Sequence, residues 1–398
     1  MDVIVVGGGI VGLSAAHAAA ERGADVTLLE KGSLGGGSTA RAAGGIRSQF
    51  STRVNVELSL ASKVVWDDFA DTFGVDIGLR KNGYLLLART EATADRFRES
   101  VRVQRNCGAE TEYLTPAEAA DRCPGIDPDP FVAATYNADD GVADPNLAVQ
   151  GYAAAARDLG VDLRTGVAVT DVHREGDRVV GVEARTDAGA ERRETEAGTE
   201  RHEADAVVNA AGAWAPRVGA LAGVDLPIVP RRRQIAVVEP SSPIPESSPL
   251  TIDLDTGSYF RPERDEIALV GGHFAEGRDT EEPADPDAFD EGMDIDWAAA
   301  AVERAADYAA YFGPDTRIRR GWAGLYAVTP DHHPIIETSR PGLVTAAGFS
   351  GHGFQHAPAT GQVVADLLFD GRSSPVDISG LDRGRFERGE SLAERNVA

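Results

Sequence analysis

Lysine is scarce in this chain of 398 residues: it occurs only as Lys31, Lys63 and Lys81. Acidic residues outnumber lysine and arginine together by 64 to 39, and the formal net charge is −25. So much negative charge repels nucleic-acid phosphates and anionic membrane surfaces, which argues against both as partners.

Cysteine is also scarce. Cys107 and Cys123 are the only two, too few for a disulfide framework or a cysteine-based metal cluster, so we expect a reducing, cytoplasmic location. No apolar run reaches the ~18 residues that span a membrane, and the apolar beginning of the chain lacks the basic leader of a signal peptide. The acidic, lysine-poor composition is typical of proteins from halophiles, because salt screens the repulsion between like charges.

Residues 2–30 carry the most informative pattern of the chain. An apolar strand leads into a turn in which Gly7, Gly9 and Gly12 are spaced G-x-G-x-x-G; an alanine-rich helix and a second strand ending at Glu30 follow. Gly7 permits the tight turn, Gly9 lets the backbone approach a pyrophosphate, and Gly12 lets the helix pack close to the strand. Glu30 can hydrogen-bond a ribose hydroxyl. The pattern predicts a dinucleotide site and by itself leaves NAD and FAD equally open.

The rest of the chain predicts mixed helices and strands, and its 42% apolar residues suffice for a large core in two lobes. Residues 31–56 are rich in glycine and serine, which favours a loop that covers a ligand. Helices are expected over 56–73, 91–107, 144–159, 297–312 and 359–369. Strands are expected over 83–88, 161–169, 178–184, 206–212, 235–238, 258–261, 267–270 and 343–347. The polar segment 186–203 is expected to be an exposed hairpin tip.

A second G-x-G-x-x-G is missing, which favours one tightly held flavin over separate flavin and nicotinamide sites. Three further segments then carry a resemblance: VVNAAGAW (207–214), GLYAVTPDHHPII (324–336) and AAGFSGHGFQHAPATG (346–361). Together with the opening pattern they resemble the FAD-dependent amine oxidoreductases of the D-amino-acid oxidase superfamily. Within it, the chain is most similar to the branch that holds monomeric sarcosine oxidase, glycine oxidase and the β subunits of dye-linked proline dehydrogenases.

The resemblance implies an α/β protein with a discontinuous Rossmann-type FAD-binding lobe and a second lobe built on an antiparallel sheet with helices. We expect the FAD-binding domain to comprise 1–80, 145–225 and 325–398, and the substrate-binding domain to comprise 81–144 and 226–324. FAD would contact residues of the opening pattern, of the glycine-rich loop and of the two later segments. These are Gly7, Gly9, Ile10, Val11, Gly12, Glu30, Lys31, Ala43, Gly44, Gly45, Val169, Ala211, Gly212, Trp214, Gly324, Gly348, Gly351, His352, Gly353, Phe354 and Gln355.

The resemblance also implies a set of substrate residues. Arg47 matches an active-site arginine of the sarcosine oxidase branch, although a surface or phosphate-contacting role stays open. Tyr326 matches a tyrosine over the flavin and His273 an active-site histidine; core packing and a structural histidine are the alternatives. Tyr259 and Arg261 could project into the pocket from a strand, and a guanidinium suits a carboxylate partner.

Three departures from the sarcosine oxidases have chemical consequences. Gly324 stands where those enzymes carry the cysteine that bonds FAD, so we expect non-covalent FAD. Leu269 stands where they carry an oxygen-activating lysine, which favours a dehydrogenase that passes electrons to a carrier over one that uses O2. Gln355 replaces a lysine that holds the substrate carboxylate; an amide can donate a hydrogen bond but brings no charge. Arg47 or Arg261 would then hold that carboxylate.

The implied reaction is oxidation of the C–N bond of an amino acid by hydride transfer to flavin N5, followed by hydrolysis of the imine. The amino acid could be a D-amino acid, glycine, an N-methyl amino acid or proline-like. Two alternatives stay open: a flavin-dependent 2-hydroxy-acid or glycerol-3-phosphate-type dehydrogenase, and a flavoprotein subunit that acts only with a partner. An oligomer or a heteromeric complex is possible under each. No metal site is expected, because His332 and His333 lack further ligands at suitable spacing.

Overall fold

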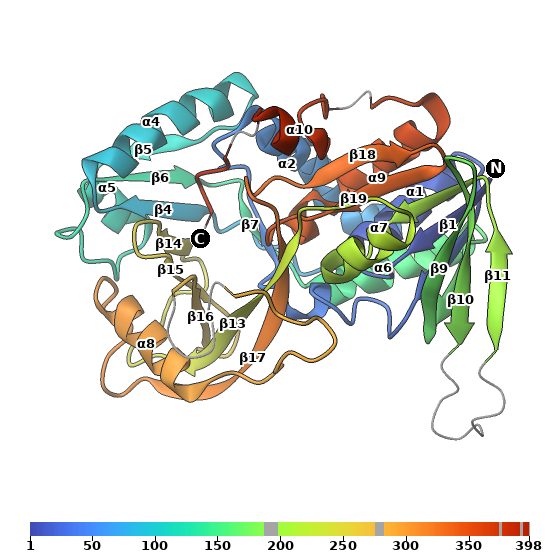
Figure 1. Cartoon of the computed structure of the whole chain (residues 1–398). Coiled ribbons are helices and arrows are strands. Elements are labelled where there is room, and N and C mark those ends of the chain that lie inside the picture. Colours follow the sequence, from blue (N-terminus) through green and yellow to red (C-terminus); the bar gives the residue numbers. More distant parts are fainter. Residues whose placement is uncertain (187–197, 275–281, 374–375, 391–392, 398) are drawn as a thin grey trace.

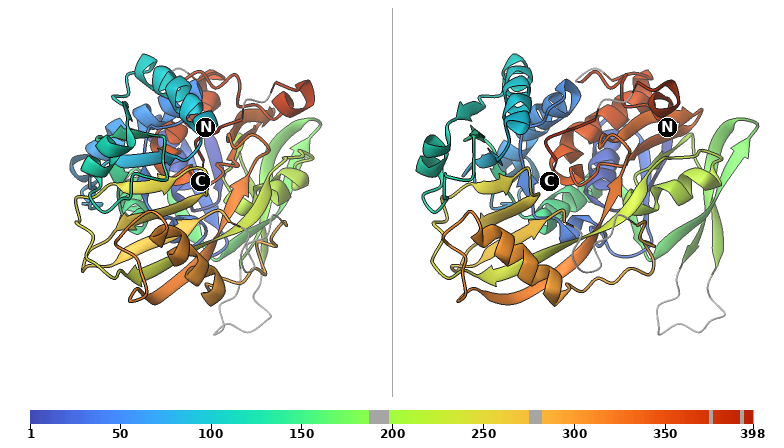
Figure 2. Two further views of the ribbon diagram at one scale, coloured as in Figure 1. Left: turned by 90° about the vertical axis from the view of Figure 1, so that its left-hand side faces the viewer. Right: turned by 60° about the vertical axis from the view of Figure 1, so that its left-hand side comes forward.

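The computed structural model describes residues 1–186, 198–274, 282–373, 376–390 and 393–397. Its elements form two lobes that lie side by side, each built on its own large sheet (Figure 1). The described C-terminal segment, residues 393–397, lies between the two lobes, as the additional views in Figure 2 also show. We call the lobe that holds the N-terminus the first lobe.

The first lobe contains a six-stranded sheet with β1 and β12 at its centre, parallel except for the edge strand β18. In spatial order its strands are β18 (Ile335–Arg340), β19 (Leu343–Ala347), β12 (Ala206–Asn209), β1 (Asp2–Val6), β2 (Asp25–Glu30) and β8 (Asp162–Thr165). α1 (Ile10–Glu21) packs against both α6 (Pro145–Asp158) and α9 (Gly353–Asp370). Segments from both ends of the chain therefore meet in one Rossmann-type layer.

The second lobe contains an eight-stranded sheet whose neighbouring strands are antiparallel apart from the parallel pair β4–β14. In order its strands are β17 (Arg317–Val328), β13 (Val229–Glu239), β16 (Ala268–Gly272), β15 (Ser258–Pro262), β14 (Leu250–Asp253), β4 (Tyr84–Ala88), β6 (Ala133–Asn137) and β5 (Glu112–Leu114). α8 (Ile295–Ala306) packs on one face of the sheet, where Phe260 and Val270 join its Trp297 in a single apolar cluster.

Smaller elements complete the two lobes. Short strands β3 (Gly45–Ile46) and β7 (Gly141–Val142) pair antiparallel, and β9 (Val167–Glu175), β10 (Arg178–Thr186) and β11 (Thr199–Glu203) form a three-stranded sheet at the outer side of the first lobe (Figure 1). The remaining helices are η1 (Thr39–Arg41), α2 (Arg53–Asp67), α3 (Phe69–Phe73), α4 (Glu91–Asn106), α5 (Pro116–Arg122), η3 (Gly212–Trp214), α7 (Ala215–Leu221) and α10 (Gly384–Arg388).

This architecture confirms the predicted fold class, with one parallel strand pair in a sheet expected to be antiparallel throughout. The predicted domain boundaries stay a prediction. The expected hairpin is present as β10 and β11, although its tip at 187–197 lies outside the described residues. In the described part of the chain, no helix is both long and apolar enough to cross a membrane.

Three expected elements differ from the structure. The strand expected over 161–169 is split at Gly166, whose positive φ of 68° ends β8 and sends β9 into another sheet. The helix expected over 297–312 ends at Ala306, because the backbone of Tyr308 and Ala310 bonds to residues 125–127. The helix expected from residue 359 starts at Gly353, and Pro358 lies inside it. This last difference places a helix N-terminus inside the predicted flavin segment.

Candidate active site

The glycine turn between β1 and α1 has the geometry of a dinucleotide turn. Gly7 has a φ of 107°, and a Cβ there would lie 2.6 Å from the carbonyl oxygen of Ala210. A Cβ on Gly12 would lie 1.9 Å from the carbonyl oxygen of Gly7. A Cβ on Gly9 would have one protein atom within 4 Å, Oγ1 of Thr39 at 3.5 Å. The packing of the chain therefore requires glycine at positions 7 and 12. At position 9 the protein itself leaves room for a side chain, so a glycine there is explained by a ligand that approaches the backbone.

Glu30 closes this turn from the end of β2. Its carboxylate accepts hydrogen bonds from the backbone N–H groups of Gly8 and Gly32, both at 2.7 Å. Beside it, the N–H of Ile10 at the start of α1 donates to Oγ1 of Thr39 at 3.2 Å. The predicted partners of the adenosine end, Gly9, Ile10 and Glu30, therefore lie together at the N-terminus of a twelve-residue helix, where N–H groups favour anionic phosphate.

Two further predicted cofactor residues meet beside the turn. The ammonium of Lys31 lies 3.7 Å from the centre of the Trp214 ring and 2.6 Å from the carboxylate of Asp287. The indole N–H of Trp214 donates to the same carboxylate at 2.8 Å. Asp287 belongs to the segment between β16 and α8 of the second lobe, so this cluster joins the two lobes next to Glu30.

The predicted loop residues Ala43, Gly44 and Gly45 cross from the first lobe to the second. A Cβ on Gly44, which has a φ of 74°, would lie 2.0 Å from the carbonyl oxygen of Ala143. A Cβ on Gly45 would lie 1.8 Å from the hydroxyl of Tyr84. Tyr84 is buried at the start of β4 and was not among the predicted site residues.

Arg47 follows this loop and is buried, with 6% of its surface exposed. Its guanidinium donates to the backbone carbonyls of Gln49 and Asn396 and lies 4.2 Å from the centre of the Phe50 ring. In the described part of the chain, no carboxylate forms an ion pair with it. Burial lowers the pKa of Arg47, and Tyr84, Glu394 and Asp140 are among the groups that oppose that shift. A buried guanidinium whose hydrogen-bond partners are neutral carbonyls is suited to a carboxylate ligand.

Gln355 lies directly beside Arg47. Its side-chain carbonyl accepts a hydrogen bond from the backbone N–H of Arg47 at 2.7 Å, and its own backbone carbonyl accepts from the indole of Trp66 at 2.9 Å. The side-chain amide nitrogen has no hydrogen-bond partner among the described residues, so it can still donate to a ligand. Gln355 therefore both anchors the arginine loop and keeps the donor that the sequence predicted.

A buried polar network that the sequence did not indicate anchors the loop that carries Arg47. The carboxylate of Asp140, fully buried, accepts from the backbone and hydroxyl of Ser48 at 2.8 and 2.9 Å, and from Lys63 at 3.0 Å. Its other oxygen accepts from the amide of Gln49 at 3.2 Å. Asp140 thus fixes the two residues that follow Arg47. It was missed because nothing in its local sequence separates it from the other acidic residues.

The strand register shows which side chains share the face of the eight-stranded sheet that carries Tyr326. Residues directly opposite each other on neighbouring strands lie on the same face. Starting from β17, the pairing and the alternation along each strand place these residues on what we call the site face: Arg320, Trp322, Gly324, Tyr326, Val328, Val229, Arg231, Arg233, Ile235, Val237, Glu239, Leu269, Gly271, Tyr259, Arg261, Leu250, Ile252, Tyr84 and Leu86. The opposite face packs on α8. The site face therefore looks toward the glycine-rich loops, as the contact of Tyr84 with Gly45 requires.

Three of the predicted substrate residues, Tyr259, Arg261 and Tyr326, lie on this face. The Tyr259 ring covers Gly271, where a Cβ would lie 2.2 Å from it. Arg261, two residues along β15, is 7% exposed and forms an ion pair with Glu263 at 2.8 Å. Burial raises the pKa of Tyr259 and lowers that of Arg261. The register places both residues on one face, their role at a substrate stays a prediction, and Arg261 already has a carboxylate partner.

His273 and Tyr326 meet edge to face, with ring centres 5.3 Å apart and planes at 83°. Loss of hydration, with the nearby charge of Arg233, lowers the pKa of His273 to about 3, so the imidazole is neutral at pH 7. Burial raises the pKa of Tyr326, and the charges of Arg233 and Arg47 oppose that shift. Tyr326 also packs on Gly351, where a Cβ would lie 2.3 Å from its ring.

The predicted flavin segment forms a strained turn from β19 into α9. Gly348, Ser350 and Gly351 all have positive φ, at 76°, 50° and 94°, and such a φ is uncommon for serine. His352 caps α9, and its ring packs edge-on against Phe50 with centres 4.9 Å apart. Burial, then the charge of Arg47, lowers the pKa of His352 well below its ordinary value. The first N–H groups of α9 therefore lie at the same end as Arg47 and Gln355.

Comparison with known proteins explains why these features occur together. The sequence pattern of the family described as "DAO: FAD dependent oxidoreductase" matches residues 2–367. The chain belongs to this family of FAD-dependent oxidoreductases. It is 31% identical to the FAD-dependent oxidoreductase domain-containing protein 1 of Xenopus laevis, covering all of this chain and 84% of that protein. It is also 31% identical to the glycine oxidase of Geobacillus kaustophilus, covering 92% of each.

Among solved structures, the fold is similar to that of the L-proline dehydrogenase from P. horikoshii. The TM-score is 0.84 at 31% sequence identity, and the match covers 98% of each chain. These relatives confirm the expected family, the expected FAD cofactor and the enzymatic nature of the protein. The individual roles predicted for site residues stay predictions.

The residues present fit the FAD of this family. The glycine turn leaves open space at Gly9, and Glu30 places a carboxylate beside it. Both features suit an adenosine diphosphate moiety. Ala211 and Gly212 follow β12 next to Gly7, and Val169 lies in β9 against the cluster that contains Leu29. The remaining predicted cofactor residues lie in α1 and at the start of α9, which follows β19. They are Val11, half-buried in α1, and Gly353 and Phe354, the first two residues of α9.

Gly324 and Leu269, two of the positions at which the chain departs from the sarcosine oxidases, have the following surroundings. A Cβ on Gly324 would lie 2.9 Å from Cβ of Arg41, whose guanidinium bonds to the loop carbonyl of Gly37 and to Glu291. Arg41 thus packs on the glycine that the resemblance aligns with the flavin-bonding cysteine, and non-covalent FAD stays a prediction. Leu269 lies on the site face in an apolar cluster with Ile235 and others, so no ammonium is provided there.

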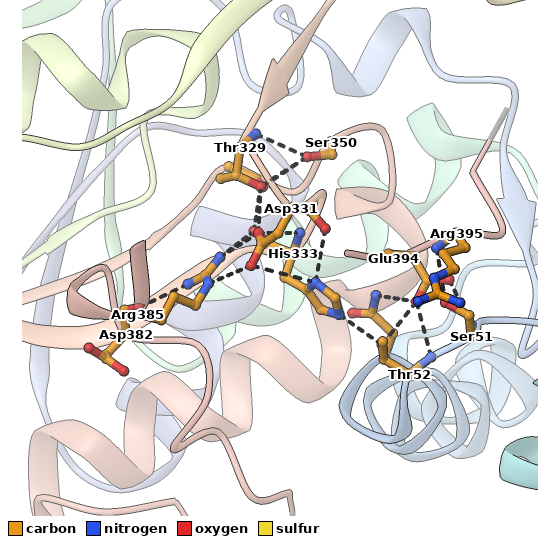
Figure 3. A network of polar contacts seen from close by, with 12 residues as sticks. Ser51, Thr52, Thr329, Asp331, His333, Ser350, Asp382, Arg385, Glu394 and Arg395 are labelled. Carbon is orange, nitrogen blue, oxygen red and sulfur yellow. Dashed lines mark hydrogen bonds and ion pairs between the residues drawn. The ribbon is translucent and has the colours of Figure 1, made fainter. Parts of the chain in front are cut away.

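His333, the second of the two adjacent histidines, connects segments around the site through its ring. Both ring nitrogens of His333 are used, Nε2 with the hydroxyl of Thr52 at 2.8 Å and Nδ1 with the carbonyl of Asp331 at 3.1 Å. Asp331 is bound at both oxygens by Arg385 of α10, and Thr52 also donates to Glu394 (Figure 3). The described residues contain no group of three or more His, Cys, Asp or Glu that could hold a metal.

Proposed function

We propose that this FAD-dependent oxidoreductase oxidises the C–N bond of an amino acid. The observation that carries the proposal is the buried guanidinium of Arg47, which has two backbone carbonyls and no described carboxylate as partners. It lies next to Gln355, whose amide nitrogen remains a free donor, and its charge acts on Tyr326 across the site. A carboxylate-bearing substrate would satisfy both groups at once.

The protein contributes binding, orientation and electrostatics. Arg47 and Gln355 would bind the α-carboxylate, and the site face with Tyr259 and Tyr326 would exclude water above it. FAD, when bound, supplies the acceptor for the two electrons and the hydrogen of the α-carbon. Holding the substrate in one orientation is the main source of rate acceleration in such a site.

The site lacks an obvious base, which bears on the protonation of the substrate. The acidic strand residue of the site face, Glu239, stands at the far end of β13 in an ion pair with Arg319, and His273 and His352 have lowered pKa values. The amine would therefore react in its neutral form, and water would hydrolyse the resulting imine. We expect the rate at subsaturating substrate to rise with pH until the amine of the free amino acid is deprotonated.

We further propose that electrons leave through a carrier rather than to O2. Leu269 supports this, because the lysine that activates oxygen in the sarcosine oxidases is replaced by an apolar side chain packed in a cluster. The relatives include both a glycine oxidase and an L-proline dehydrogenase, so both acceptor types occur among them.

The test follows the flavin itself under anaerobic conditions. Amino acids and 2-hydroxy acids are added to the FAD-loaded protein, and loss of the visible absorbance of oxidised flavin is recorded. Bleaching by amino acids that is weakened about 10- to 100-fold in Arg47→Leu supports the proposal, because a charge-assisted bond is then lost. Bleaching by hydroxy acids alone, or unchanged bleaching in Arg47→Leu, refutes it. Admitting air or an artificial electron acceptor then shows which one reoxidises the flavin.

A further inference from the structure

The site face carries positive charge in a chain that is otherwise strongly acidic. Of the strand residues on it, Arg231, Arg233, Arg261 and Arg320 are cationic, and the acidic Glu239 stands at the far end of β13, where it pairs with Arg319. The whole chain has 64 acidic residues and a net charge of −25. A face that is rich in arginine within such a protein attracts an anion.

Two arginines approach the site from different elements. Arg47 comes from the loop after β3, and Arg261 comes from β15 on the site face. Tyr84 lies within electrostatic reach of both, since each guanidinium opposes the rise in its pKa that burial causes. The two arginines therefore come from different elements and have separate partners, the carbonyls of Gln49 and Asn396 for Arg47 and the carboxylate of Glu263 for Arg261.

The charges near Arg261 do not balance. Glu263 is the carboxylate that pairs with Arg261, at 2.8 Å, and it also pairs with Arg80 at 2.8 Å. Two guanidinium groups thus share one carboxylate, which leaves one positive charge. In addition, Nε of Arg261 and Nη1 of Arg80 are buried and find no hydrogen-bond acceptor among the residues that the structure describes. Buried donors without an acceptor are costly, so this corner of the site lacks an anion.

We propose that the substrate is an amino acid with a second carboxylate, the α-carboxylate held by Arg47 and the second one by Arg261. The proposal rests on the proposed oxidation of an amino acid. The second carboxylate belongs to the side chain, as in aspartate or glutamate, or to a substituent on the nitrogen, as in N-(carboxymethyl)glycine. In either place it supplies the acceptor that Nε of Arg261 lacks and the charge that Glu263 leaves unbalanced.

The test compares matched substrates on the FAD-loaded protein, again by anaerobic flavin bleaching. Alanine is paired with aspartate, and N-methylglycine with N-(carboxymethyl)glycine, each chiral compound as both enantiomers. We expect the dicarboxylate of at least one pair to half-saturate the protein at a concentration about 10- to 100-fold lower than its monocarboxylate partner. The pair that shows the difference locates the second carboxylate. Equal half-saturation in both pairs overturns the proposal.

Variants separate binding from damage to the fold. Arg261→Leu should abolish the preference for the dicarboxylate, so that the two members of a pair half-saturate the variant at similar concentrations. Glu263→Gln should lower the half-saturating concentration of the dicarboxylate, because Arg261 then lacks a competing partner; a merely disrupted site would not bind more tightly. Arg319→Leu, an exposed arginine paired with Glu239, removes the same charge elsewhere and should change neither substrate.

The outcomes distinguish the two proposals. If monocarboxylates bleach the flavin as well as dicarboxylates do, and Arg261→Leu affects both alike, the amino-acid chemistry stands and the second carboxylate is refuted. If no amino acid of either kind bleaches the flavin, the proposed function fails and this inference fails with it.

Discussion

Glycines 9 and 12 of the dinucleotide turn should respond differently to alanine. In Gly12→Ala the new methyl group would lie 1.9 Å from the carbonyl oxygen of Gly7, so the backbone of the turn has to move. Overpacking against side chains costs 1–3 kcal/mol, and a backbone contact this close belongs at or above the top of that range. Better helix propensity returns at most about 1 kcal/mol. We expect the FAD-free protein to lose at least about 2 kcal/mol of unfolding free energy.

Gly9→Ala meets no such obstacle. The methyl group would find one protein atom within 4 Å, at 3.5 Å, and the φ of −73° suits alanine. Alanine is a poorer helix cap than glycine, so the FAD-free protein should change by less than about 1 kcal/mol. FAD binding should nevertheless weaken at least about tenfold, because the methyl group occupies the space where the pyrophosphate approaches the backbone.

The assay has two parts. Urea denaturation of the FAD-free proteins gives the unfolding free energies, and titration with FAD, followed by flavin fluorescence, gives the affinities. The reasoning predicts a separation: Gly12→Ala damages the fold, and Gly9→Ala damages only cofactor binding. Wild-type FAD affinity in Gly9→Ala would refute the assignment of this glycine to the pyrophosphate, and an unchanged unfolding free energy in Gly12→Ala would refute the packing argument.

Three further predictions concern charge, pH and the cofactor linkage. Asp140→Asn should lower the unfolding free energy by about 2 kcal/mol in urea denaturation, because the buried ammonium of Lys63 then keeps only its exposed partner Asp139; a loss below about 1 kcal/mol would contradict this. Burial lowers the pKa of His356 from 6.5 to about 3, so the unfolded chain binds a proton that the folded one does not, and stability falls by about 1.4 kcal/mol per pH unit below pH ~6.5. His356→Asn should flatten that slope in thermal scans between pH ~6.5 and ~4, and parallel slopes would argue against the assignment. FAD should appear wholly in the supernatant after acid precipitation, since no cysteine stands at Gly324; yellow colour that remains in the pellet would show a covalent bond.

Local patterns predicted much of the fold because their physical causes are local. Capping residues mark two helix starts, with Thr115 in a full capping box and the Asp144 side chain accepting from two N–H groups. In contrast, the apolar spacing showed α9 only from residue 359, whereas tertiary packing lets the helix begin at Gly353 and contain Pro358.

The candidate site was predictable where a backbone requirement or a family motif marks it, and not elsewhere. Tyr84 carries no local signal, since it is one tyrosine at the start of an apolar strand; it matters because β4 is brought beside Gly45 from the other lobe. Asn396 contacts Arg47 across most of the length of the chain, and no pattern in either segment indicates that contact. Such contacts depend on how sheets pack and not on neighbouring residues.

The sequence by itself determined the dinucleotide turn, the FAD chemistry and the family, because a φ above zero, a close approach of two backbones and a motif are properties of short segments. Only the tertiary structure decided which side chains face one another. It showed that Arg261 shares Glu263 with Arg80, that Asp140 anchors the loop of Arg47, and that no described carboxylate pairs with Arg47. Charge balance in a pocket is set by residues from many elements, so it exists only once the chain is folded.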